Sequence, residues 1–324
     1  MDREEKGGTV KKPGTQSVKM VLEQRQEELL KKANVVGVGI GEKITGGLPV
    51  GRLCLKVYVE KKLKKSALAK SDLVPLELSH IETDVEEVGK IKPLAQGIAV
   101  RRANTARIRP ALGGASIGHY KITAGTLGCL VRDKKTGRNF ILSNNHVLAN
   151  SNKAKKGDAI IQPGAADGGK APDDKIANLE RWIKIDFSDA GNLVDASLAA
   201  PVSEEVVKPE IASIGAPRGV SKAKLKTIVQ KSGRTTGHTM GRIKDVSVTM
   251  KIDYGRKSAL FRNQILTTAM SQGGDSGSLV LDEKKRAVGL LFAGSDQATL
   301  CNPIQEVLRL LEVVLQGDRA RKGA

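Results

Sequence analysis

Aromatic residues are nearly missing from this sequence: phenylalanine, tryptophan and tyrosine together make up 2% of its 324 residues. A core must therefore be built from aliphatic side chains, and little surface remains on which single-stranded nucleic acid could stack its bases. Cysteine is also scarce. Cys54, Cys129 and Cys301 cannot form a disulfide framework, and no Cys/His cluster has metal-ligand spacing. The sequence predicts apolar core cysteines, no metal and no cofactor.

Long apolar runs are missing as well. No apolar stretch reaches 18 residues, and residues 1–6 hold no apolar segment of the kind found in secretory signals. Free cysteines are typical of a reducing compartment. Together these features predict a cytoplasmic protein without a membrane span.

Positive charge is abundant, with a net charge of +19. Such a balance can attract nucleic acid or an acidic membrane surface. The basic side chains are spread along the whole chain, however, and the densest run, residues 61–65, is typical of a solvated loop. Nucleic-acid or membrane-surface binding is therefore the least favoured function class, and a steep salt dependence of binding would be its signature.

Composition divides the chain into segments. We expect a disordered tail at 1–16, an α+β unit of unknown role at 17–105, a catalytic domain at 106–318 and a basic tail at 319–324. In the second segment Ser17 can cap a helix that ends at Asn34, and strands are expected near 35–40, 53–59 and 81–88.

The most informative motif is Gly274-Asp275-Ser276-Gly277-Ser278. Glycines let the backbone turn tightly enough for two N–H groups, those of Gly274 and Ser276, to converge beside the serine hydroxyl. Such an arrangement is an oxyanion hole. Short Gly/Asp/Ser runs are also ordinary turn chemistry, so the motif needs a base and an acid elsewhere in the chain.

A base and an orienting acid are both present. His146 follows an apolar strand and a small polar turn, a rigid position that suits a general base. Asp195 stands in the apolar segment 192–199, where a buried carboxylate needs a donor such as a histidine ring N–H. Asp189 is the rival acid, although its Ser-Asp-Ala-Gly setting is typical of a turn.

With these motifs in order, the chain resembles the chymotrypsin/trypsin-like serine peptidases over about residues 106–318. The order His146, Asp195, Ser276 is that of this family. The resemblance implies a mainly β fold of two antiparallel β-barrels, about 120–212 and 213–302, with a C-terminal helix at 303–315 after the small N-terminal α+β unit. It also implies that these three residues hydrolyse peptide bonds.

A fourth motif, Ser232-Gly233-Arg234-Thr235-Thr236-Gly237, is similar to a segment of the bacterial α-lytic and streptogrisin-type proteases. In that branch an internal arginine pairs with the aspartate before the nucleophile. An unpaired buried Asp275 would cost about 3–5 kcal/mol. We therefore expect an Arg234–Asp275 ion pair that holds the oxyanion loop open without activation cleavage.

The scarcity of cysteine departs from those secreted enzymes: Met240 and Val147 stand where relatives carry cysteine. The nearer resemblance is to the bacterial intracellular proteases and the plant narrow-leaf-type proteases that share this style. By resemblance, residues 292–294 pair with the substrate strand, and Met270 forms the floor of the primary pocket. The predicted pocket comprises Met270, Ser271, Leu291, Phe292, Ala293 and Gly294. It holds no carboxylate and favours a small or medium apolar residue before the scissile bond, not lysine or arginine.

Three function classes follow. The leading one is a serine endopeptidase acting on a protein or peptide, and the alternative is a non-hydrolytic peptide-binding or scaffold protein on a protease fold. The basic binder described above is the third. His238 is either a packing residue or part of the pocket, and His119 is either a turn residue or a gate. A homo-oligomer is left open.

Overall fold

The computed structural model describes residues 13–94 and 104–316, and the chain forms two compact units, Met1–Glu87 and Val88–Ala324. Most of the expected disordered tail and all of the basic tail lie outside the described residues. The division falls at residue 87 instead of the expected 105, because the segment after Glu87 hydrogen-bonds to the second unit. No helix in the described part of the chain is both long and apolar enough to cross a membrane.

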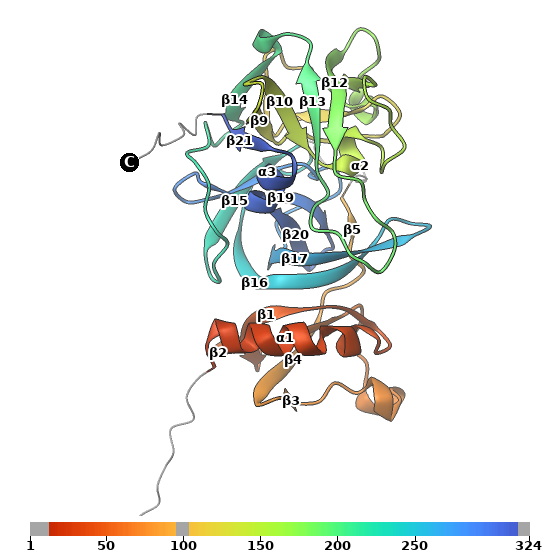
Figure 1. The fold of residues 1–324 in the computed structure, drawn as a ribbon, viewed down its shortest axis with the longest axis vertical. Helices are drawn as coiled ribbons and strands as arrows, with labels where there is room; N and C mark the ends of the chain where they lie inside the picture. The colour runs from red at the N-terminus through yellow and green to blue at the C-terminus, as the bar shows by residue number, and fades with distance from the viewer. Residues whose placement is uncertain (1–12, 95–103, 317–324) are drawn as a thin grey trace, which may run out of the picture. The chain divides into compact units, whose positions relative to one another are not determined.

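The first unit is a small sheet covered by one helix, the α+β unit that the sequence predicts. Its strand order is β1-β2-β4-β3, with β2 and β4 parallel and the other pairs antiparallel. Figure 1 shows α1 along one face of this sheet, where Val18, Val21, Leu22 and Leu29 are buried. The helix begins two residues before Ser17, so Ser17 is not its cap. The elements are α1 (Thr15–Leu30), β1 (Val35–Thr45), β2 (Leu48–Val59), η1 (Lys65–Ala67), η2 (Lys70–Asp72), β3 (Glu77–Leu78) and β4 (Ile81–Glu87).

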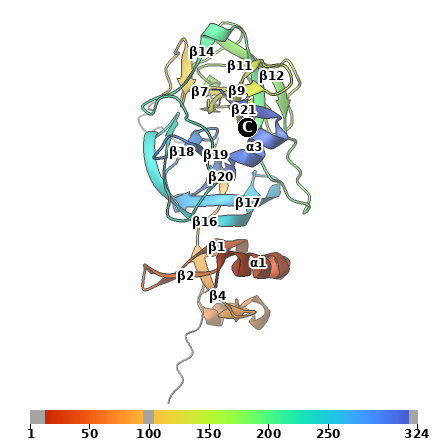
Figure 2. The same ribbon diagram turned by 60° about the vertical axis from the view of Figure 1, so that its left-hand side comes forward.

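The second unit contains two antiparallel barrels (Figures 1 and 2), which confirms the predicted fold class. The first barrel has the order β21-β9-β10-β13-β12-β11-β7-β8. It closes because β8 continues through Leu127 and Gly128 into β9. Its strands are β7 (Ser116–His119), β8 (Gly125–Thr126), β9 (Cys129–Asp133), β10 (Asn139–Ser143), β11 (Ala159–Ile161), β12 (Lys175–Trp182), β13 (Ser197–Pro201) and β21 (Val313–Leu315). The barrel also carries α2 (Asn145–Leu148) and η3 (Ala165–Asp167).

The second barrel has the order β15-β18-β19-β20-β17-β16, and β16 pairs back with β15 to close it. A short strand, β5 (Lys92–Pro93), adds to β19. The barrel strands are β15 (Ile228–Gly233), β16 (Gly237–Asp253), β17 (Ser258–Thr268), β18 (Leu279–Asp282), β19 (Ala287–Gly294) and β20 (Ala298–Pro303). Between the barrels in sequence lie η4 (Glu204–Val206) and β14 (Val207–Ile211), which pairs in parallel with β6 (Ala111–Gly113).

The C-terminal helix is shorter than predicted. The helix α3 spans Ile304–Leu310, and Val313–Leu315 form β21 on the edge of β9. The turn between them is made by Glu312, whose φ of 54° is incompatible with a continuing helix. Two adjacent valines suit a strand, and β9 offers the backbone partners that a helix would otherwise supply.

Both barrels have aliphatic cores, as the scarcity of aromatic residues requires. One cluster lies inside the first barrel around Ile117, Ile141 and Leu179. Another lies inside the second barrel around Val229, Ile265 and Leu291. A third, which includes Leu198, Leu290 and Val307, packs α3 against both barrels. Because both barrels have packed cores, the loops that connect their strands are attached to rigid elements.

Candidate active site

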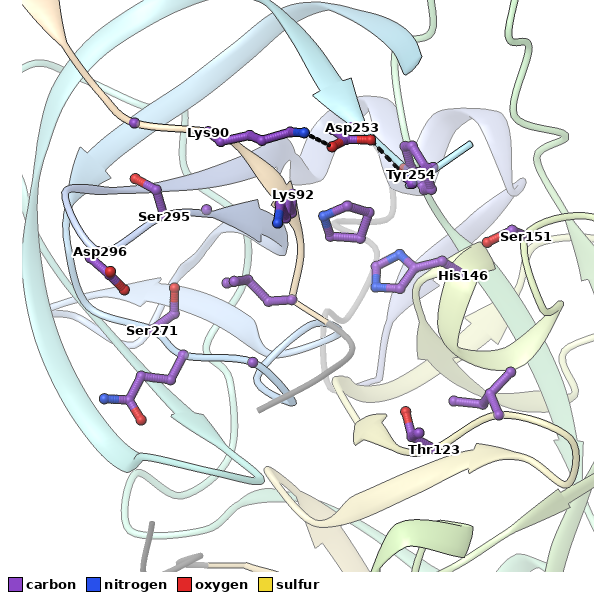
Figure 3. Close-up of a pocket in the computed structure, with 18 of the residues that line it drawn as sticks. Lys90, Lys92, Thr123, His146, Ser151, Asp253, Tyr254, Ser271, Ser295 and Asp296 are labelled. Carbon is purple, nitrogen blue, oxygen red and sulfur yellow. Dashed lines mark hydrogen bonds and ion pairs between the residues drawn. The ribbon is translucent and has the colours of Figure 1, made fainter. Parts of the chain in front are cut away.

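An open cleft lies between the two barrels (Figure 3). The first barrel contributes residues 121–123, His146 and the turn after α2, and the second contributes Asp253, Tyr254 and the loop at 271–273. The segment that precedes the barrels, from Gly89 to Leu94, lines the same cleft. Of the candidate residues named by the sequence analysis, His146, Ser271 and Gly294 line this cleft.

His146 and Asp195 are hydrogen bonded within this cleft. The His146 Nδ1 atom lies 2.6 Å from Asp195 Oδ2, and the His146 backbone N–H donates to Oδ1 at 3.2 Å. His146 stands on the short helix α2, and Asp195 lies two residues before β13. Asp195 is fully buried. The rival acid, Asp189, lies in an exposed turn.

Asp195 has two further partners that the sequence analysis missed. The Tyr254 hydroxyl donates to Oδ2 at 2.8 Å, and the Asp195 N–H donates to Asn302 Oδ1 at 3.0 Å. Burial and the neighbouring carboxylate raise the pKa of Tyr254 well above its usual value, so its hydroxyl remains a donor. No local sequence pattern marks either residue, because each reaches Asp195 from the other barrel.

Four of the chain's eight aromatic residues form a chain of ring contacts that begins at His146. Tyr254 makes an edge contact with the His146 ring at 6.4 Å between centroids, and Phe187 packs on Tyr254 at 5.6 Å. Phe261 continues the chain of contacts from Tyr254 to Phe292, at 6.3 and 4.8 Å. Large rigid rings are thus concentrated where they hold an imidazole and exclude water.

Ser276 lies in a loop whose backbone requires glycine at positions 274 and 277. Gly274 and Gly277 have φ values of 101° and 100°, and a Cβ on Gly274 would collide with the Thr235 hydroxyl and the Arg234 guanidinium. The Ser276 hydroxyl is buried and donates to the Phe292 carbonyl at 2.9 Å. The remaining His146 nitrogen, Nε2, is buried without a hydrogen-bond partner among the described residues.

Thr126 of the first barrel supports this loop, and sequence reasoning did not identify it. Its N–H donates to the Ser276 carbonyl at 2.7 Å, and its hydroxyl donates to the Gly274 carbonyl at 2.8 Å. The same hydroxyl accepts the Arg234 N–H at 3.0 Å. One residue of the first barrel therefore fixes two turns of the second.

The expected Arg234–Asp275 ion pair is wrong. Asp275 instead pairs with Lys231, whose Nζ lies 3.2 Å from Oδ2, and both side chains are fully buried. Backbone N–H groups of Thr235 and Thr236 donate to Asp275 Oδ1 at 2.9 and 3.1 Å. Burial lowers the pKa of Lys231, and the Asp275 charge opposes that shift.

Arg234 pairs with a different buried carboxylate. Its Nε and Nη2 atoms donate to the two oxygens of Asp167 at 2.5 and 2.7 Å, a bidentate geometry. Asp167 belongs to η3 of the first barrel. The forked guanidinium of Arg234 suits Asp167 because its Nε and Nη2 donors reach the two oxygens of that carboxylate.

The residues predicted to form the pocket surround the chain's own segment 92–94. Pro93 and Lys92 pair with Ala293 and Gly294 of β19 in antiparallel register. The side chain of Leu94 belongs to the apolar cluster that contains Met270 and Leu291. The other two predicted pocket residues lie close by: Ser271 lines the cleft, and the Phe292 carbonyl accepts the Leu94 N–H at 3.4 Å.

The Leu94 backbone also reaches the nucleophile loop. Its carbonyl accepts a hydrogen bond from the Gly274 N–H, and its N–H donates to Ser276 Oγ at 3.0 Å. Within the described part of the chain, no such bond joins the Ser276 N–H to this carbonyl. Of the two N–H groups expected to bind the oxyanion, that of Gly274 therefore donates to a peptide carbonyl.

The remaining candidates lie away from this chemistry. His119 is buried and hydrogen bonded to Asp158 at 3.0 Å, whereas His238 is exposed and contacts Gln230 at 3.0 Å. Neither lines the cleft. Burial raises the pKa of the Cys129 thiol to about 12, so it stays protonated at neutral pH.

Comparison with known proteins gives similarity to solved structures alone. No protein-family model matches the chain, and no curated protein matches it. Similar structures include Thermobifida fusca Protease A, with 19% identity over 63% of this chain and 98% of that one, at a TM-score of 0.46. A Cellulomonas bogoriensis chymotrypsin is 17% identical over 63% of this chain and 97% of that one, at a TM-score of 0.43. A glutamic acid specific serine protease, which utilizes a histidine triad in substrate binding, is 21% identical over 63% of this chain and 100% of that one, at a TM-score of 0.46. Likenesses of this size support no statement about activity.

Proposed function

We propose that the chain is a serine endopeptidase with Ser276 as nucleophile, His146 as base and Asp195 as orienting acid. One observation carries the proposal: a peptide carbonyl, that of Leu94, accepts the Gly274 N–H, and the Leu94 N–H reaches the Ser276 hydroxyl, in the cleft that His146 lines. Acyl transfer requires these groups in one place.

The mechanism follows from the protonation states that the contacts favour. Asp195 accepts a hydrogen bond from the Nδ1–H group of His146. The other ring nitrogen, Nε2, then carries no proton and can take the proton of the Ser276 hydroxyl. Asp195 then stabilises the imidazolium, and the Tyr254 hydroxyl holds the carboxylate in place. The Gly274 and Ser276 N–H groups bind the oxyanion, each donor contributing about 2.7–4 kcal/mol in enzymes of this kind.

One observation favours the alternative of a peptide-binding protein. The Ser276 hydroxyl donates to the Phe292 carbonyl, and His146 Nε2 has no partner among the described residues. A module that only held peptides would need the β19 edge and the apolar pocket but no proton transfer. Reactivity of the serine therefore separates the two functions.

We expect a fluorophosphonate probe to label Ser276 most readily in Leu94→Asp, because a carboxylate cannot remain in the apolar pocket and the segment leaves the cleft. Labelling is followed by gel fluorescence and by mass spectrometry of the labelled peptide. Adding Ser276→Ala or His146→Ala to this variant should abolish it. If folded Leu94→Asp stays unlabelled, the peptidase proposal fails and the binding function is preferred.

The pocket further supports a preference for an apolar residue of medium size before the scissile bond. Leu94 already packs in an apolar cluster with Met270 and Leu291. We expect leucine to exceed lysine or arginine at this position by at least about a hundredfold in kcat/KM, because an unpaired cation would be buried. A peptide-library profile measures this, and a profile dominated by lysine and arginine would contradict it.

A further inference from the structure

The segment from Val88 to Leu94 lies in the cleft as an extended peptide, so its contacts show which chemistry the cleft accepts. Its strand β5 runs antiparallel to β19, with Lys92 opposite Gly294. The side chain of Leu94 packs in the apolar cluster of the predicted pocket. A separate peptide that bound in the same register would therefore meet, residue by residue, the groups that this segment meets.

Most of the polar contacts upstream of the pocket involve the backbone of the segment. The Ser295 hydroxyl donates to the Val88 carbonyl at 2.5 Å, and the Asp253 N–H donates to the Ile91 carbonyl at 3.0 Å. Every residue carries such a carbonyl. These bonds therefore fix the register of a bound peptide without selecting its sequence.

The carboxylate of Asp253 adds a contact that depends on a side chain (Figure 3). The Lys90 Nζ atom lies 2.6 Å from Asp253 Oδ2, and the two side chains are 53% and 18% exposed. The other oxygen, Oδ1, accepts the Gly255 N–H at 2.7 Å, which fixes the carboxylate in its turn. The hydrogen bond from Lys90 lowers the pKa of Asp253 most, and the Gly255 N–H adds to this effect. The cleft therefore presents a fixed anion to one position of the bound segment.

We propose that Asp253 is a specificity-determining residue that selects peptides with a basic residue four positions before the residue in the apolar pocket. Lys90 stands at this distance from Leu94. The inference rests on the proposed function for the reaction and names its substrate class. That class is an extended peptide with a basic side chain upstream and an apolar side chain of medium size at the reacting bond.

The position of the basic residue matters because the cleft carries charges of both signs. Lys121 and Lys153 of the first barrel line it, and so does a second acid, Asp296. Within the segment, Lys90 forms the ion pair with Asp253, whereas Lys92 acts on that carboxylate only by a weaker attraction between charges. A general excess of positive charge in a peptide is therefore not enough, and the preference is expected at one position.

The test measures the binding of labelled synthetic peptides to the full-length protein with Leu94→Asp, which frees the cleft, and Ser276→Ala, which prevents turnover. The parent peptide has the sequence of residues 88–94, a second peptide carries Lys90→Glu, and a control peptide carries Lys92→Glu. Fluorescence anisotropy gives the dissociation constants. We expect the parent to bind about fivefold more tightly than the Lys90→Glu peptide, because a partly exposed ion pair contributes no more than this. The Lys92→Glu peptide should bind within about twofold of the parent.

Two protein variants in the same background locate the preference. Asp253→Lys should reverse the order of the parent and Lys90→Glu peptides. Asp296→Lys makes the same change of charge at an exposed residue of the same cleft, and it should leave the order unchanged. The preference should also shrink at about 1 M salt, because salt screens a half-exposed lysine.

The outcomes separate this inference from the proposed function. The role of Asp253 is overturned if no peptide binds, if the parent and Lys90→Glu peptides bind equally, or if their order survives Asp253→Lys. With Ser276 restored in Leu94→Asp, release of an aminocoumarin from the amides of the same peptides measures hydrolysis. Hydrolysis without preference leaves the peptidase standing and removes the inference. The expected order of binding with neither hydrolysis nor fluorophosphonate labelling removes the peptidase and leaves Asp253 as the selecting residue of a peptide-binding cleft.

Discussion

Replacing Asp195 by Asn is expected to lower kcat by about 10⁴-fold with the fold intact. The His146 backbone N–H needs an acceptor at the Oδ1 position, so the amide oxygen takes that place and the amide nitrogen faces the ring. A donor there forces the imidazole to accept at Nδ1 and to carry its proton on Nε2. His146 can then no longer take a proton from Ser276. The measurement is kcat on a peptide with leucine before the scissile bond, alongside thermal unfolding.

Tyr254→Phe is the matched control for this change. It removes a hydrogen bond of 2.8 Å to the same carboxylate oxygen but leaves the His146 tautomer unchanged. We expect a loss of less than about tenfold, in keeping with one modest hydrogen bond. An Asp195→Asn protein that retained kcat within the range of Tyr254→Phe would exclude Asp195 as the orienting acid.

Replacing Lys231 by Met is expected to destabilise the second unit by about 3–5 kcal/mol. The change leaves the Asp275 carboxylate without its cation in a site where both side chains are fully buried. Because Asp275 precedes Ser276, the nucleophile loop should lose its shape as well. The free energy of unfolding in urea measures the first effect, and fluorophosphonate labelling in a Leu94→Asp background measures the second.

Two companion variants sharpen this experiment. Lys208→Met removes an exposed lysine of β14 and should change stability by no more than about 0.5 kcal/mol. Adding Asp275→Asn to Lys231→Met removes the orphaned charge and should recover part of the stability. If Lys231→Met costs no more than Lys208→Met, the ion pair is not what stabilises Asp275.

The two barrels were predicted through the resemblance to a family, and the strand pattern agreed with them without being able to single them out. The apolar runs around Phe140, Val229 and Leu281 are strands in the structure, as expected. Val313–Leu315 was misassigned to a helix, since an apolar run at helical spacing serves a strand equally well when a sheet edge is free.

The ion pairs could not be predicted in the same way. Lys231 and Arg234 stand three residues apart, and either could have met Asp275 by sequence alone. The choice depends on Asp167, which the fold brings to Arg234 from the first barrel. A resemblance that carried the arginine over from related motifs therefore named the right kind of interaction and the wrong partner.

The occupied cleft was equally hidden in the sequence. Residues 91–94 fell within the predicted α+β unit at 17–105, because Ile91-Lys92-Pro93-Leu94 has no pattern that marks a site. Its contacts with Phe292 and Ser276 join positions nearly two hundred residues apart, including a separation of 182 residues between Leu94 and Ser276. The expectation that no activation cleavage is needed rested on an internal cation beside Asp275, and Lys231 takes the place expected of Arg234.

Thr126 ties the Ser276 loop of the second barrel to the first barrel through hydrogen bonds. Its hydrogen bonds to the Ser276 and Gly274 carbonyls and to the Arg234 N–H cannot open one at a time without leaving buried polar groups unsatisfied. Local fraying of the loop is thereby tied to parting of the barrels, so its amides exchange with solvent deuterium only as fast as the whole second unit opens. The conformation of the Ser276 loop and the packing of the two barrels are therefore lost together, in one cooperative step.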